Sequence, residues 1–184
     1  MTDKIEIRIS GLGGQGVVLA GRILGEAAVY SGKNAVQTQS YGAEARGSVA
    51  KSEVIISVGK IGFPMVRKCD ILIAMSQEAV EKNVKDLKKK GLLIIDSTTV
   101  KDTPKIEARI FKIPATETSK EVLGEKLYAN IIMLGALGKI ARIINEKSME
   151  KTIRNTFSEK FVAINMSAYR KGKELPSKEE ASSP

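Results

Sequence analysis

A short glycine-rich segment near the start of the chain places the strongest constraint on its fold. Residues 11–16 read Gly-Leu-Gly-Gly-Gln-Gly, and their first, third and last glycines fit the pattern G-x-G-x-x-G. Residues 5–9 alternate isoleucine with charged residues, which predicts a strand with its three isoleucines on one face. Residues 17–28 repeat apolar side chains at helical spacing. The segment is therefore predicted to be a tight turn between a strand and a helix.

Such a turn is suited to bind the phosphate groups of a ligand. Glycine permits positive φ angles and lets a ligand approach the backbone closely. The free N–H groups at the start of the following helix then face an anion. Gly11, Gly13, Gly14, Gln15 and Gly16 are therefore candidate ligand-binding residues. The alternative is a purely structural turn that lets the helix pack closely on the sheet.

A second candidate segment follows the next predicted strand, residues 35–40. We interpret strand, helix and strand as a βαβ unit whose two strands pair in parallel. The polar loop after the second strand contains Tyr41, Arg46 and Gly47. Arginine is a natural bidentate ligand of phosphate or carboxylate, although an ion pair between Arg46 and Glu44 explains it equally well. The turn and the loop are expected at the carboxyl edge of the sheet, where ligands bind in such folds.

The rest of the chain alternates strands with helices and then becomes helical. Further strands are predicted over residues 49–58, 70–75, 92–95 and 108–113, and helices over 76–89, 117–127, 129–144, 149–157 and 159–171. We predict one α/β domain over residues 1–172, a three-layer α/β/α sandwich with a mainly parallel, Rossmann-like sheet and a helical C-terminal third. Residues 173–184 are charged and rich in Ser and Pro, and we expect a disordered tail there.

The composition excludes several kinds of catalytic site. The 184 residues contain no histidine and a single cysteine, Cys69. No Ser-His-Asp or Cys-His arrangement can form, and Cys69 has no partner for a cysteine-based metal site. We therefore predict no catalytic residue and no metal ligand, so that cofactors or other chains would supply any chemistry. Asn130, at the start of an apolar helix, is better explained as a cap or a contact to a loop than as a ligand-binding residue.

The charge and hydropathy of the chain limit the classes of partner that it can bind. The net charge of +9 suits an anionic ligand or acidic protein partners. Aromatic residues are only 4% and the lysines are spread along the chain, which argues against nucleic acid. No apolar run reaches the roughly 18 residues of a transmembrane helix, and the first residues lack the apolar core of a signal peptide. We expect no membrane association and a cytoplasmic location.

The glycine turn lacks the partner that a dinucleotide site needs. An NAD site uses an acidic residue about 20 positions after the glycines to bind the ribose hydroxyls. Residues 35–40 contain neither Asp nor Glu. Arg46 could instead meet the extra phosphate of NADP, so a free-standing NADP-binding reductase domain remains the alternative function.

Five separated segments resemble the gamma subunits of 2-oxoacid:ferredoxin (acceptor) oxidoreductases, of the 2-oxoglutarate or pyruvate type. The resemblance extends over residues 7–172, and Ser48 departs from it where the family often has a glycine. The matching segments are the GxGGQG turn at 11–16, the SYGxExRG loop at 40–47, the strand and Ser-Gln-Glu helix start at 70–78, the N-x-x-x-L-G-A helix at 130–136 and the closing N-x-x-A-x-x-x-G at 165–172.

The resemblance implies an enzyme subunit that is inactive alone. Such enzymes oxidatively decarboxylate a 2-oxoacid on thiamine diphosphate and magnesium, pass electrons through [4Fe-4S] clusters to ferredoxin and release acyl-CoA. Alpha, beta and, in some enzymes, ferredoxin-like delta subunits are the implied partners; a homodimer of the isolated chain is also open. The gamma subunit is implied to shape the CoA side of the active site. The glycine turn and the Tyr41–Gly47 loop would face CoA and the catalytic subunits, and Arg46 would meet a CoA phosphate or a partner carboxylate.

Overall fold

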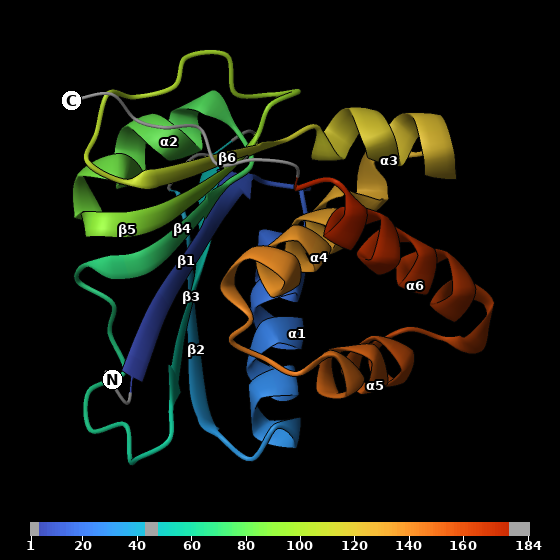
Figure 1. The fold of residues 1–184 in the computed structure, drawn as a ribbon, viewed down its shortest axis with the longest axis horizontal. Coiled ribbons are helices and arrows are strands. Elements are labelled where there is room, and N and C mark those ends of the chain that lie inside the picture. Colours follow the sequence, from blue (N-terminus) through green and yellow to red (C-terminus); the bar gives the residue numbers. More distant parts are fainter. Residues whose placement is uncertain (1–3, 43–47, 177–184) are drawn as a thin grey trace.

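Among the described residues, six strands form one sheet in the order β2-β3-β1-β4-β5-β6 (Figure 1). The computed structural model describes residues 4–42 and 48–176. The neighbours β1–β4, β4–β5 and β5–β6 are parallel, whereas β3 is antiparallel to both of its neighbours. The predicted α/β class with a mostly parallel sheet is therefore confirmed. The strands are β1 (Lys4–Leu12), β2 (Asn34–Tyr41), β3 (Val49–Ser57), β4 (Cys69–Ala74), β5 (Leu87–Asp96) and β6 (Arg109–Ile113).

Helices lie on both faces of the sheet. One face is covered by α1 (Val17–Tyr30) and α4 (Ala129–Ala141), and α5 (Glu146–Thr156) and α6 (Glu159–Glu174) pack on the outer side of these two helices. The other face carries α2 (Gln77–Asn83) and a short 3₁₀ turn, η1 (Val84–Asp86). Beyond β6, the chain forms α3 (Ala115–Leu123) and the 3₁₀ turn η2 (Lys126–Tyr128) before it enters α4. The C-terminal third is helical, as predicted.

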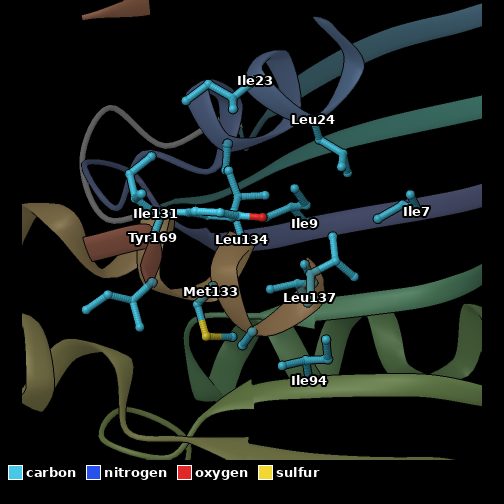
Figure 2. Close-up of a cluster of buried hydrophobic side chains, with 14 of the residues drawn as sticks. Ile7, Ile9, Ile23, Leu24, Ile94, Ile131, Met133, Leu134, Leu137 and Tyr169 are labelled. Atoms are coloured by element: carbon cyan, nitrogen blue, oxygen red, sulfur yellow. The ribbon is translucent and has the colours of Figure 1, made fainter. Parts of the chain in front are cut away.

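The central strands are apolar on both faces and so form two cores. Ile7 and Ile9 of β1 pack with Leu134 of α4 and Tyr169 of α6 in the larger core (Figure 2). Leu72 of β4 points to the other face and packs in the smaller core under α2. Each such side chain contributes about 1.5–3 kcal/mol when fully buried. The central strands are thus fixed from both sides, which holds their carboxyl ends in place.

The predicted parallel pairing of the first two strands is wrong. β3 lies between β1 and β2: its residue Val54 pairs with Ile7 of β1 on one side and with Gln37 of β2 on the other. β2 and β1 still run in the same direction, but they are not neighbours. The connection from β2 to β3 is short, so β3 can only fold back beside β2 as an antiparallel strand, since a parallel neighbour needs a crossover of a dozen or more residues. β3 then occupies the place between β1 and β2.

The helix predicted over residues 76–89 is also too long. α2 ends at Asn83, and the lysines at 88–90 lie in β5. The Nζ of Lys88 is 2.9 Å from a carboxylate oxygen of Glu6 and 2.9 Å from one of Asp70. These ion pairs hold the segment in an extended conformation across the sheet. They join residues far apart in sequence, so helical spacing cannot reveal them.

The last helix packs closely against α4. A Cβ added at Gly135 or at Gly172 would collide with the backbone of the facing helix, at Tyr169 and Ile132 respectively. Two segments of the family resemblance therefore meet as a helix–helix contact. α6 extends to Glu174, two residues into the segment predicted to be a tail. Residues 177–184 lie outside the described residues, and the tail there remains a prediction.

Candidate functional site

The glycine turn lies between β1 and α1, at the carboxyl edge of the sheet. Gly14 and Gly16 have positive φ angles of 94° and 71°, which glycine adopts readily. Both Gly13 and Gly14 are exposed. In the described parts of the chain, no hydrogen bond uses the N–H of Gly14 or Gly16. The first amides of α1 have no partner within the helix either. Among the described residues these N–H groups have no acceptor, so the turn can donate hydrogen bonds from them to an anion.

Gln15 holds the turn closed from the inside. Its Oε1 accepts a hydrogen bond from the Leu12 N–H at 2.6 Å, and its Nε2 donates to the Met75 carbonyl at 2.7 Å. A Cβ at Gly11 would lie 2.5 Å from the same Oε1. Both ends of the Gln15 amide are thus occupied within the protein. Gln15 and Gly11 shape the turn and connect it to the end of β4.

Asn130 of α4 fastens the other end of the turn. Its side chain is buried, its Nδ2 donates to the Gly16 carbonyl at 3.1 Å, and its Oδ1 accepts from the Ile131 N–H at 2.9 Å. A Cβ at Gly16 would collide with the Asn130 amide. The contact to a loop that the sequence suggested for Asn130 is confirmed, and the loop is the glycine turn itself.

The β2–β3 hairpin brings Tyr41 to the same edge of the sheet. The Gly13 N–H donates to the Ser48 carbonyl at 3.1 Å, which joins the turn directly to the hairpin. Tyr41 is 63% exposed. The predicted placement of the turn and of Tyr41 at one edge of the sheet is therefore confirmed. Arg46 and Gly47 lie outside the described residues, so their roles stay predictions.

Two hollows flank the glycine turn. The outer hollow, of about 490 Å³, lies between α1 and β2 and is lined by the turn together with Gln39 and Tyr41. The inner hollow, of about 660 Å³, lies beyond β4 and β5 and is lined by the turn together with Thr99, Thr116 and Lys126. The chain leaves β1 toward α1 on one face and leaves β4 toward α2 on the other. Such a switch point is where open α/β sheets bind ligands.

Sequence reasoning identified the turn residues of the inner hollow but missed the polar residues that line it or support it beyond β5. The buried carboxylate of Asp96 accepts from the N–H of Thr98 at 3.1 Å and from the hydroxyl of Thr116 at 2.5 Å. The Thr99 hydroxyl donates to the Met75 carbonyl at 2.9 Å. These bonds tie the end of β5 to α3 and to β4. The available signal was the polar run that follows the apolar part of β5, whereas nothing in the sequence pointed to Lys126.

Cys69 and the acidic residues do not form a chemical centre in the described residues. No group of three or more His, Cys, Asp or Glu there could hold a metal ion. Burial raises the pKa of the Cys69 thiol to about 11, which keeps it protonated and unreactive near neutral pH. Over residues 4–42 and 48–176, no helix is long and apolar enough to span a bilayer.

Comparison with known proteins identifies the family. Residues 6–175 match the family described as pyruvate ferredoxin/flavodoxin oxidoreductase. The chain belongs to this family. It is 46% identical over 173 residues to the 2-oxoglutarate synthase subunit KorC of Methanocaldococcus jannaschii, with 92% of each chain covered. The membership in the oxidoreductase family that the motifs predicted is confirmed.

Solved structures agree with this assignment. The gamma subunit of a keto/oxoacid ferredoxin oxidoreductase from Geobacter sulfurreducens PCA is similar, with a TM-score of 0.86, 41% identity and coverage of 94% of this chain and 95% of that one. The 2-oxoglutarate:ferredoxin oxidoreductase of Magnetococcus marinus, with 2-oxoglutarate, coenzyme A and succinyl-CoA bound, also has a TM-score of 0.86, at 26% identity. This match covers 95% of the present chain and 31% of that chain. The oxidoreductase gamma fold is thus found both as a separate subunit and within a longer polypeptide.

The free-standing reductase alternative is not favoured. In an NADP-binding unit, the strand after the first helix lies beside the first strand and brings its end to the glycine turn. Here β3 occupies that position. The two similar proteins named above as KorC and as a gamma subunit are both subunits of oxoacid oxidoreductases.

Proposed function

We propose that this chain is the gamma-type subunit of a 2-oxoglutarate:ferredoxin oxidoreductase, which oxidatively decarboxylates the 2-oxoacid to acyl-CoA. The near full-length similarity to a 2-oxoglutarate synthase subunit supports the substrate. Alpha, beta and delta-type partner subunits, ferredoxin as the electron acceptor and a cytoplasmic location belong to this proposal. The [4Fe-4S] clusters would reside on the partners, since each needs four cysteine thiolates and the chain has one cysteine; thiamine diphosphate and magnesium would reside there as well. A homodimer of the isolated chain stays a prediction.

The observation that supports a role at the CoA side is the exposed glycine turn with its free N–H groups. Gly16 and the first residues of α1 line the outer hollow, so the backbone N–H groups of these residues are placed to meet the phosphates of CoA. The exposed ring of Tyr41 lines the same hollow and offers a face on which the adenine can stack. Arg46 and Gly47, next along the hairpin, would complete this contact. The subunit itself performs no chemical step; it binds and orients CoA for the partners.

The test is steady-state kinetics of enzyme reassembled with Tyr41→Ala or Arg46→Ala. We expect each variant to raise the KM for CoA by about tenfold, the effect of losing about 1.4 kcal/mol of binding, with the KM for 2-oxoglutarate unchanged. Arg154→Ala, at an exposed position on α5, is the matched control. Normal assembly with an unaltered KM for CoA would refute the CoA role. A preference of the wild-type enzyme for pyruvate would refute the 2-oxoglutarate assignment.

A further inference from the structure

The opposite edge of the sheet carries a surface that the CoA role does not use. Residues 58–68 connect β3 to β4 across this amino edge, near the start of β1 and away from the glycine turn (Figure 1). Three large apolar side chains on this connection are exposed by 69%, 51% and 58%, and three exposed cations accompany them. We call these six residues the amino-edge patch: Val58, Phe63, Met65, Lys60, Arg67 and Lys68.

The patch is presented by an anchored backbone. Val66 is buried and packs in the core under α2. Its carbonyl accepts a hydrogen bond of 3.1 Å from the buried guanidinium of Arg8. Because the chain is pinned at Val66, the side chains of Met65 and Arg67 on either side remain outside. Apolar groups held in this way can be buried against a partner with little loss of conformational entropy.

Among the residues that the structure describes, the cations of the patch have no acidic partner. Nearby Lys88 is paired with Glu6 and Asp70, but no ion pair in the described chain involves a cation of the patch. The Arg67 guanidinium lies 5.5 Å from the centroid of the Phe63 ring. A hollow of about 430 Å³ beside them is lined by four cations and a single carboxylate. The patch therefore combines exposed apolar area with uncompensated positive charge.

We propose that the amino-edge patch docks an acidic surface of a partner subunit of the oxidoreductase. This inference rests on the proposed function and adds the face through which the subunit assembles. The partner surface that fits the patch has carboxylates around an apolar centre. Such a surface complements the three exposed cations and the apolar side chains of the patch, on a chain of net charge +9. A nucleic acid fits less well, because Arg67 already lies over the one aromatic ring of the patch.

The test compares two triple charge reversals in binding to the remaining subunits. The patch variant is Lys60→Glu with Arg67→Glu and Lys68→Glu. The control, Lys120→Glu with Lys147→Glu and Arg154→Glu, makes the same change of charge at exposed positions on α3 and α5. We expect the Kd of the patch variant to rise at least about tenfold, with the control near wild type. The wild-type Kd should also rise with salt, because exposed charges are screened.

Each remaining outcome has a defined meaning. Equal Kd values for the two charge-reversal variants would overturn the docking face but leave the proposed function intact, provided that wild-type protein assembles and supports CoA-dependent turnover. Failure of wild-type protein to assemble would instead refute the proposed function and this inference with it. Circular dichroism checks folding; if the patch variant unfolds, Phe63→Ser, which keeps the charge, must weaken binding in its place. A salt-dependent gel shift with RNA that only the patch variant loses would also overturn the proposal.

Discussion

The contact between Gly16 and Asn130 leads to a specific prediction about the glycine turn. Gly16→Ala forces an L-residue to a φ of 71° and places a methyl group against the buried Asn130 amide. The left-handed backbone costs about 1–2 kcal/mol, overpacking about 1–3 kcal/mol and the lost hydrogen bond about 1 kcal/mol. We therefore expect Gly16→Ala to lower the free energy of unfolding by about 3–6 kcal/mol, measured by equilibrium urea denaturation.

Two further variants separate the causes of this loss. Gly14→Ala is the matched control: its φ is 94°, but its Cβ would meet nothing within 4 Å. It should lose only the backbone contribution of about 1–2 kcal/mol. In the double variant Gly16→Ala with Asn130→Ala, the colliding amide is absent and the shared hydrogen bond is lost only once, so its loss should be smaller than the sum of the single losses by about 2–4 kcal/mol. Equal losses at Gly14 and Gly16, or strict additivity with Asn130→Ala, would refute the reasoning.

Three other predictions concern buried charges and the thiol. Arg8→Ala leaves the carboxylates of Glu53 and Asp86, each 2.7 Å from the guanidinium, without their buried cation. Urea denaturation should show that the free energy of unfolding falls by about 3 kcal/mol. Arg22→Ala, which removes an exposed ion pair, should lower it by less than about 1 kcal/mol. Equal losses would contradict a role for burial. Burial alone would raise the pKa of Glu6, but hydrogen bonds from Lys4 and Lys88 outweigh it and lower the pKa. Glu6 thus stabilises the fold above its unfolded-state pKa, and this stabilisation is lost as the pH falls through its folded-state pKa. Glu6→Gln should therefore make the free energy of unfolding less dependent on pH in the acid range. An unchanged acid dependence would argue against the ion pairs. Burial raises the pKa of Cys69 from 9.0 to about 11, so the stability that comes with the neutral thiol is full below pH 9 and is lost between there and pH 11. Cys69→Ala should remove that alkaline loss, and rapid labelling of native Cys69 by a thiol reagent at pH 8 would contradict its burial.

Local patterns predicted the strands well but not the charges between them. The alternation around Ile7 and Ile9 correctly assigned β1 and its apolar face. It equally suggests that Arg8 faces solvent, yet Arg8 is 2% exposed. Its partners lie on β3, on η1 and on the connection before β4. Such a network depends on tertiary neighbours, so a periodicity of two along one strand cannot reveal it.

The glycine motif predicted its own conformation but not what fixes it. The pattern predicted a turn at the same edge of the sheet as Tyr41, and the structure places both there. The contacts of Gln15 with Met75 and of Asn130 with Gly16 join distant segments of the chain. The sequence contained both side chains but not their partners. Lys126 reaches the inner hollow only because η2 leads the chain back from β6 to α4.

The insertion of β3 explains how a dinucleotide-type glycine motif can serve another ligand. In a Rossmann unit, the end of the second strand lies beside the turn and supplies the acid that binds the ribose. Here the hairpin start of β3 takes that place, and the end of β2 moves one strand away, about 4.8 Å. The free N–H groups for phosphate are retained, whereas the ribose acid is replaced by an exposed ring, Tyr41. On the proposed function, the inserted strand removes the position of the ribose acid but leaves the phosphate-facing turn, and this combination suits CoA shared with a partner chain better than a dinucleotide.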